Sequence, residues 1–339
     1  MSQPPVILLL MRKEAPGYYS IERLFESLVP LLSKRFKVEI VRVPCRSSGF
    51  LRCLRNLIFT ARLRADVIHV TGDIYYCALA VPRRRCVLTI HDLCSLNRLK
   101  GLRKLLFSVI WYSLPLRWAS CVTTISEEIR RQLEREFPST TSKVQLIPNC
   151  VDEAFPRNYR FARTSTSRPQ VLQVGTGANK NLERVAVAAS GLSLCLRIIG
   201  PLSSGQQALL CSMNLSWTST ERLSPEKLVA EYQNSDMLVF ASTYEGFGLP
   251  IIEAQAIGLP VITSNKAPMM EIAGDAALFV DPYKESEIRA ALEQLLWSPD
   301  LARRLSDQGR RNAERFSTMA VADQYSAAYV RTLSRVNYC

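Results

Sequence analysis

The chain has 339 residues, of which 47% are hydrophobic, and carries 43 Lys and Arg against 30 Asp and Glu, a net charge of +13. This length and apolar content predict two ordinary domains, and no apolar run approaches the length needed to cross a bilayer. The charge excess lies in residues 1–150, with 24 basic and 11 acidic residues, whereas residues 151–339 hold 19 of each. The first half therefore favours an anionic partner: an acidic lipid surface, a lipid-linked pyrophosphate, an acidic glycan or nucleic acid.

The ten cysteines are scattered and contain no Cys-x-x-Cys pair. Several fall inside apolar runs, so we expect buried thiols in a reducing cytoplasm. The apolar run Val6–Met11 is short and is followed by its basic residues, the reverse of a signal peptide, and it is interpreted as a first strand.

Strand-like and helix-like segments alternate through the first half, which is typical of a parallel α/β sheet. The predicted strands span residues 6–10, 36–43, 66–72, 86–90, 119–125 and 144–152, with helices over 21–32, 48–64, 102–118 and after Ser126. His91 directly follows one of these strands, where ligands bind in such sheets. His69 lies inside a strand and is interpreted as an interior histidine.

Two basic segments of the first half, 48–64 and 98–118, also contain many large apolar residues. One interpretation is docking on an anionic membrane, with the apolar side down and the cations toward the lipid head groups. The other is that residues 102–118 form a partly buried helix packed on the sheet. Both interpretations stay open at the level of sequence.

The second half begins after a linker at 153–169 with a strand and the loop Gly175-Thr-Gly-Ala-Asn-Lys180. A nicotinamide site is disfavoured, because the third glycine and the acidic residue after the next strand are absent. Lys180 is either a solvated loop residue or a cation for a diphosphate. A further strand is predicted at 194–200 and two amphipathic helices at 286–329.

The most informative stretch spans residues 236–281. Its part up to residue 263 predicts a strand, a glycine turn, a helix starting near Pro250, and another strand. The helix N-terminus offers backbone N–H groups of Phe247, Gly248 and Leu249 to a phosphate. The carboxylates of Glu245 and Glu253 can each accept hydrogen bonds from two hydroxyls, as a sugar or ribose presents. Together they suggest a nucleotide-sugar site, although each glutamate alone is also explained by solvation or by the helix dipole.

The wording Glu245-Gly-Phe-Gly-Leu-Pro-Ile-Ile-Glu253-Ala resembles the signature of retaining glycosyltransferases of the GT-B fold, sequence family 4, the mannosyltransferase-like group 1 enzymes. Gly258-Leu-Pro-Val-Ile and Thr89-Ile-His-Asp-Leu match the same family. The resemblance implies an α/β fold with two Rossmann-like domains whose parallel sheets face a central cleft. The implied divisions are an acceptor-side domain (1–160), a nucleotide-sugar domain (161–320) and a final helix crossing back (321–339).

The resemblance also implies roles for single residues. Glu245 would hold the donor sugar, Glu253 the ribose and His91 the sugar's far hydroxyl, with Lys180 on the diphosphate. The remaining implied donor contacts are Gly17, Gly175, Thr176 and the backbone of Phe247, Gly248 and Leu249. Thr176 stands where the family has an arginine, and Arg184 is a candidate replacement for that cation.

The function implied is transfer of a sugar from a nucleotide-diphosphate sugar to a glycan or lipid-linked acceptor in cell-surface polysaccharide or glycolipid synthesis. The chain has no Asp-x-Asp, so neither a metal nor another cofactor is expected. Two alternatives share the fold: an inactive sugar-binding relative, suggested by Thr176, and a nucleotide-sugar epimerase. Nucleic acid is not expected as a partner, because the cations are not interleaved with aromatic residues in an RNA-binding motif.

Overall fold

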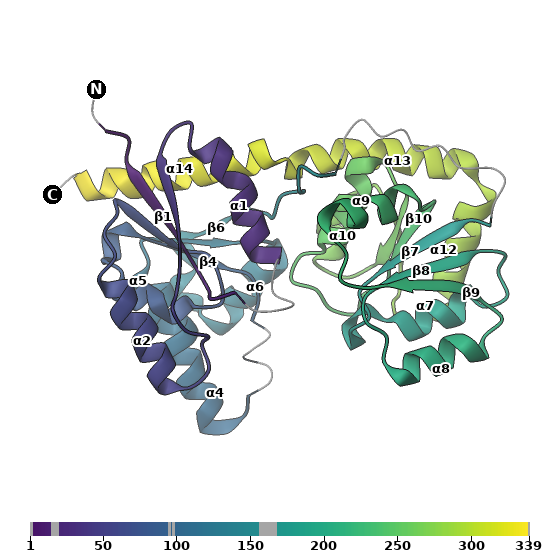
Figure 1. Ribbon diagram of the computed structural model, residues 1–339, viewed down its shortest axis with the longest axis horizontal. Coiled ribbons are helices and arrows are strands. Elements are labelled where there is room, and N and C mark those ends of the chain that lie inside the picture. Colours follow the sequence, from purple (N-terminus) through teal and green to yellow (C-terminus); the bar gives the residue numbers. More distant parts are fainter. Residues whose placement is uncertain (1–2, 15–19, 94–95, 97–98, 156–167, 338–339) are drawn as a thin grey trace. The chain divides into compact units, whose positions relative to one another are not determined.

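A computed structural model of the chain describes residues 3–14, 20–93, 96, 99–155 and 168–337. It contains two compact units (Figure 1). Unit 1 comprises Met1–Cys150 together with Thr318–Cys339, and unit 2 comprises Val151–Ser317. The first boundary therefore falls ten residues before the predicted 160, and the final segment begins at Thr318 where the sequence suggested 321.

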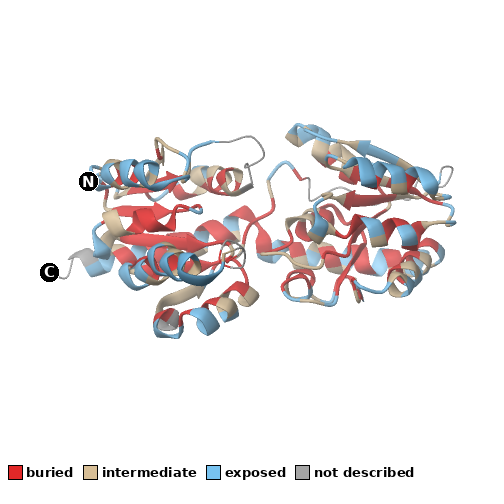
Figure 2. Ribbon diagram, turned by 90° about the horizontal axis from the view of Figure 1, so that it is seen from below, coloured by how far each residue is buried: buried red, intermediate tan, exposed pale blue. Residues whose placement is uncertain are grey.

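Unit 1 contains a six-stranded parallel sheet in the order β2-β1-β3-β4-β5-β6. Its strands are β1 (Val6–Met11), β2 (Lys37–Arg42), β3 (Val67–Val70), β4 (Cys86–Ile90), β5 (Cys121–Thr124) and β6 (Val144–Leu146). Its α-helices are α1 (Ser20–Leu32), α2 (Phe50–Ala61), α4 (Gly101–Phe107), α5 (Leu114–Trp118), α6 (Glu127–Glu136) and α14 (Thr318–Asn337). The central strands are buried along their whole length, as expected for a sheet covered on both faces (Figure 2).

Unit 2 contains a second six-stranded parallel sheet in the order β12-β11-β10-β7-β8-β9. Its strands are β7 (Gln170–Val174), β8 (Cys195–Ile199), β9 (Ser216–Thr220), β10 (Met237–Phe240), β11 (Val261–Ser264) and β12 (Leu278–Val280). Its helices are α7 (Leu182–Ala189), α8 (Ser204–Ser212), α9 (Pro225–Gln233), α10 (Leu249–Ile257), α11 (Met269–Ala273), α12 (Glu285–Trp297) and α13 (Pro299–Ala313). The two sheets confirm the prediction of two Rossmann-like α/β domains.

Helix α14 belongs to unit 1, where it packs beside α1. Tyr325 and Tyr329 are fully buried in the unit 1 core. The Nδ1 atom of His69 lies 2.8 Å from the Tyr329 hydroxyl, and its Nε2 atom lies 2.7 Å from Thr89 Oγ1. Burial lowers the pKa of His69 to about 3, so the ring is neutral and joins the last helix to the sheet.

One prediction from the sequence was wrong, and one predicted helix, 102–118, is present but irregular. The tail forms three helices where two were predicted, because Ser298 caps α13 by accepting a hydrogen bond from the Leu301 N–H group, and Pro299 begins that helix. Residues 101–118 form α4, a π-helical stretch η3 (Ser108–Ser113) and α5 in direct succession, with much of the apolar surface of α4 exposed.

Candidate functional site

The unit 2 candidates meet at the carboxyl ends of β7 and β10, two neighbouring strands. From β7 the chain proceeds outward through β8 and β9, whereas β10, β11 and β12 lie on the other side. This reversal is the position where open α/β sheets bind ligands. Here Lys180 Nζ lies 2.7 Å from Glu245 Oε1, with 22% and 13% of the two side chains exposed. The structure thus places the predicted diphosphate cation and the predicted sugar carboxylate side by side.

The loop after β7 is shaped to place Lys180. Gly175 has φ +88°, and a Cβ atom there would lie 2.9 Å from both Cε and Cγ of Lys180. Two features therefore require glycine at this position: the left-handed backbone, and the lysine side chain that lies against it. The Asn179 side chain donates to the Tyr244 carbonyl and to Glu245 Oε1 at 2.9 and 3.2 Å, which ties this loop to the loop after β10.

Helix α10 begins with Leu249 and Pro250 and has no side-chain cap at its N-terminus. Gly248 precedes it with φ +107°, and a Cβ atom there would lie 3.1 Å from Ile251 Cδ1. The Phe247 side chain is buried against Phe316, with ring centroids 5.8 Å apart, so only its backbone can serve a ligand. The Ile251 N–H group donates to the Gly248 carbonyl at 3.0 Å. The absence of a side-chain cap is consistent with the predicted phosphate contact of the Phe247, Gly248 and Leu249 N–H groups.

Glu253 lies in the first turns of α10 and is partly buried. Its Oε2 atom accepts a hydrogen bond from the hydroxyl of Tyr232, a fully buried residue of α9. Burial and the neighbouring Glu253 raise the pKa of Tyr232, so its hydroxyl keeps its proton and can only donate to this carboxylate. Tyr232 thereby fixes the orientation of Glu253.

Thr176, which stands at the position of the family's arginine, and Arg184, the candidate replacement for that cation, are both engaged in other contacts. Thr176 Oγ1 donates to the Pro201 carbonyl. Arg184 donates to Asn181 Oδ1 at 3.0 Å and pairs with Glu285 at 3.4 Å, with its guanidinium over the Tyr283 ring. Replacement of the family's arginine by Arg184 would therefore require these contacts to break.

His91 follows β4 in unit 1 and is 6% exposed. Its Nε2 atom lies 2.7 Å from the carbonyl oxygen of Thr71, and burial lowers its pKa to about 4. Because a carbonyl only accepts, the neutral ring must carry its proton on Nε2. Nδ1 is then the ring atom that can accept a hydrogen bond from a hydroxyl.

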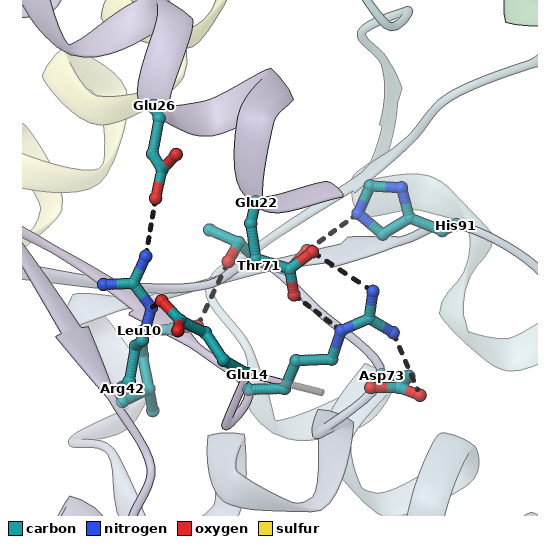
Figure 3. A network of polar contacts seen from close by, with 9 residues as sticks. Leu10, Glu14, Glu22, Glu26, Arg42, Thr71, Asp73 and His91 are labelled. Carbon is teal, nitrogen blue, oxygen red and sulfur yellow. Dashed lines mark hydrogen bonds and ion pairs between the residues drawn. The ribbon is translucent and has the colours of Figure 1, made fainter. Parts of the chain in front are cut away.

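Charged residues lie at the same edge of the unit 1 sheet, with Glu22 and Asp73 nearer to His91 than Glu14, Glu26 and Arg42 (Figure 3). Arg12 follows β1 and donates to both carboxylate oxygens of Glu22, at 2.6 and 3.2 Å, and lies 3.5 Å from Asp73. Arg42 similarly pairs with Glu26 at 2.6 Å and Glu14 at 3.1 Å. The predicted contact Gly17 lies outside the described residues.

Sequence reasoning missed Asn179, Tyr232 and the Arg12–Glu22 pair. Asn179 adjoins Lys180, so its position beside the candidate cation was a signal that could have been used. Tyr232 is 21 residues from Glu253 and lies in an ordinary amphipathic helix, so nothing in the sequence marks their contact. In the described part of the chain, no three His, Cys, Asp or Glu side chains are grouped to hold a metal ion.

Two family models match the chain, and they divide it as the fold does. The model described as "Glycosyltransferase Family 4" matches residues 22–155, and the model described as "Glycosyl transferases group 1" matches residues 157–312. The chain belongs to the glycosyltransferases that these two models describe. The match covers the Lys180 loop and the Glu245–Glu253 segment, which carried the resemblance.

Similar proteins support the same assignment. The chain is 40% identical over 231 residues to an MMP alpha-(1->4)-mannosyltransferase of Mycolicibacterium hassiacum, covering 64% of this chain and 55% of that relative. It therefore spans about half the length of this relative.

Among solved structures, a glycosyltransferase of Rickettsia africae aligns over 98% of this chain and 99% of its own, with a TM-score of 0.77 and 17% identity. An Anabaena protein solved in complex with UDP and glucose aligns over 96% of this chain and 100% of its own, with a TM-score of 0.74 and 16% identity. These likenesses establish the GT-B fold of the chain.

Proposed function

We propose that this glycosyltransferase family member moves a sugar from a nucleotide-diphosphate sugar to a glycan or lipid-linked acceptor, with retention of anomeric configuration. The observation that carries the proposal is the Lys180–Glu245 pair at the carboxyl ends of β7 and β10. The mannosyltransferase relative supports sugar transfer, and the Anabaena structure with UDP and glucose supports a nucleotide-diphosphate sugar as the donor. Glu245 and Glu253 would bind hydroxyls, and Lys180 the diphosphate.

In the proposed reaction, the bond between the anomeric carbon and the diphosphate oxygen breaks while a bond to the acceptor oxygen forms. Negative charge develops on the diphosphate, and Lys180 and the N–H groups at the start of α10 stabilise it. The acceptor attacks from the face that the leaving group vacates, which retains the configuration. The acceptor's proton passes to the departing phosphate oxygen. His91 accepts a hydrogen bond from a donor-sugar hydroxyl through Nδ1.

We also propose that the transfer needs no metal ion, because Lys180 supplies a cation for the leaving group. Thr176 favours one competing function, an inactive sugar-binding relative, since its hydroxyl is bonded to Pro201 and brings no charge. An epimerase of the same fold would act on the donor alone. Product analysis with the donor in the presence and absence of acceptor separates these three functions.

The first experiment is a thermal-shift screen against UDP, GDP, ADP, TDP and their sugars, because a ligand that binds the native state raises the melting temperature. Transfer by the purified protein is then compared with Glu245→Gln and Lys180→Ala variants, each expected to lower the rate by about 100-fold or more. Glu293→Gln is the control and should leave the rate unchanged, because Glu293 lies in α12 and pairs with Arg289, outside the candidate site. Near-normal transfer by both site variants would refute the proposed mechanism.

We further propose that unit 1 docks on the cytoplasmic face of an anionic membrane through α2 and α4. Six large apolar side chains on these helices are exposed to at least 39%: Phe50, Leu51, Leu54, Leu102, Leu105 and Leu106. Basic residues flank them, including Arg52, Arg55, Lys100, Arg103 and Lys104. An apolar surface bordered by cations fits an anionic bilayer interface. No described helix is both long and apolar enough to span a bilayer.

Co-sedimentation with phosphatidylglycerol vesicles tests the membrane proposal. The double variant Leu105→Ser, Leu106→Ser should sediment less than the unmodified protein. Trp297→Ser is the matched control, because Trp297 is 71% exposed but lies in unit 2. Equal sedimentation of both variants, or none by the unmodified protein at low salt, would eliminate this surface as a membrane site.

A further inference from the structure

A pocket of about 360 Å³ opens beside the charged residues of unit 1. None of the described residues that line it is among the proposed donor contacts. It is lined by Arg12, Lys13, Cys45, Arg46, Ser47, Ser48 and Asp73. These residues follow β1, β2 and β3, so the pocket lies at the carboxyl edge of the sheet. Its volume is within the range of small-molecule sites, about 300–1,000 Å³.

The charges around the pocket are unequally neutralised. Glu22 binds the Arg12 guanidinium with both oxygens, and Glu14 and Glu26 engage Arg42. Among the described residues, by contrast, the exposed side chains of Lys13 and Arg46 have no carboxylate partner. Two cations are thus available to a ligand at the pocket mouth.

Asp73 is the acidic residue that lines the pocket. Its carboxylate lies 3.5 Å from Arg12, and 57% of its side chain is exposed, so it can reach a ligand in the pocket. A carboxylate repels a simple anion but accepts hydrogen bonds from sugar hydroxyls. The combination of two cations with one carboxylate favours a ligand that carries both an anionic group and hydroxyl groups.

Buried hydrogen bonds from α2 and from Tyr76 hold the loop that carries Arg46 in place. Asn56 of α2 is fully buried, and its side chain accepts from the Cys45 N–H group at 3.0 Å and donates to the Cys45 carbonyl at 2.9 Å. It also donates to the Tyr76 hydroxyl at 2.8 Å, which is hydrogen-bonded to Ser47 at 3.0 Å. A buried polar network of this kind fixes the loop before a ligand arrives, which lowers the entropic cost of binding.

We propose that this pocket binds a phosphate-bearing, hydroxylated group of the acceptor, with Lys13 and Arg46 on the phosphate and Asp73 on hydroxyls. The inference rests on the proposed transferase function, whose acceptor it specifies, and the site lies wholly in unit 1. Its chemistry fits a soluble sugar phosphate and a phosphorylated lipid head group equally, so the experiment must separate these two sources.

The test measures how fast Lys13 reacts with a small amine-directed reagent, followed by peptide mass spectrometry of the full chain. Glucose 6-phosphate should slow the labelling of Lys13 but not that of Lys34, an exposed lysine outside the pocket, and glucose should slow neither. Arg46→Ala should raise the half-protecting concentration about tenfold, the value of a charge-assisted hydrogen bond, whereas Lys34→Ala should not change it.

Phosphatidylglycerol vesicles provide the second arm of the test, with phosphatidylcholine vesicles as the uncharged control. Protection of Lys13 by anionic vesicles alone, weakened in Arg46→Ala, assigns the phosphate to a lipid head group, whereas protection by glucose 6-phosphate assigns it to a soluble acceptor. If neither probe protects Lys13 more than Lys34, or if Arg46→Ala behaves as Lys34→Ala does, the assignment is overturned.

The outcome is independent of the donor site. The melting temperature is measured with UDP, GDP, ADP and TDP on the same samples. A response to one of these nucleotides without protection of Lys13 contradicts the acceptor pocket alone. Protection of Lys13 without a response to any nucleotide contradicts the proposed transferase function and leaves an anion site in unit 1.

Discussion

Substitution of Gly175 by alanine would test whether the loop after β7 exists to place Lys180. The residue has φ +88°, where an alanine costs about 1–2 kcal/mol. The new Cβ atom would also lie 2.9 Å from Cε and Cγ of Lys180. The lysine must then move away from Glu245 and from the Phe240 ring, whose centroid is 4.7 Å from its Nζ atom.

Displacing Lys180 breaks a partly exposed ion pair and a cation–π contact, each of which contributes about 0.5–1 kcal/mol to the free energy of unfolding. Gly175→Ala should therefore lower the free energy of unfolding by about 2–4 kcal/mol. Gly191→Ala is the matched control, because Gly191 has φ +76° but no atom within 4 Å of the position of its Cβ. It should cost only the backbone term of about 1–2 kcal/mol.

Urea denaturation followed by circular dichroism measures both free energies, and thermal shift with the nucleotide sugars measures donor binding. Gly175→Ala should weaken donor binding, whereas Gly191→Ala should leave it unchanged. Equal destabilisation by the two variants together with equal donor affinity would refute the argument that Gly175 accommodates Lys180.

Three further predictions concern other parts of the site and fold. Tyr232→Phe removes the hydroxyl that donates to Glu253 and should destabilise the protein by about 1–2 kcal/mol while weakening nucleotide binding, as denaturation and thermal shift would show; unchanged values would mean that Tyr232 does not orient Glu253. The pKa of His69 is lowered to about 3, so its contribution to stability is complete above its unfolded pKa of 6.5 and is lost as pH falls toward 3. The free energy of unfolding that is lost between pH 7 and 5 should therefore be about 2 kcal/mol smaller in His69→Gln than in the unmodified protein. An identical loss in both proteins would contradict the neutral buried ring. Transfer should persist in excess EDTA, and loss of activity that Mg²⁺ restores would overturn the proposal of a metal-independent reaction.

The sequence was sufficient for the alternation of strands and helices, because apolar runs and turn glycines are local signals. Gly248 and Gly258 bound α10 as the pattern indicated, both with left-handed backbones. It was not sufficient for β9 (Ser216–Thr220), an edge strand whose Ser-Trp-Thr-Ser-Thr composition lacks the apolar pattern of a buried strand. Local pattern also missed the break at Pro299, since α12 and α13 are both amphipathic.

For the candidate site, the sequence suggested single residues but not the contacts between them. The resemblance pointed to Lys180 and Glu245 separately, yet their contact depends on β7 and β10 being neighbours, which only tertiary pairing determines. The exposed apolar residues of α4 show the same limit. Amphipathic helices on a sheet and on a membrane have similar sequences, and burial in the folded chain is what distinguishes them.

The placement of α14 in unit 1 has a consequence for the order of folding during synthesis. Unit 2 is one continuous segment, so all of its residues have left the ribosome before any of α14 does. Unit 1 begins first but lacks Tyr325 and Tyr329, the side chains that cover His69 and the neighbouring core, until translation passes residue 329. The unit translated second is thus the first able to complete its core, and the nascent unit 1 exposes apolar surface throughout that interval.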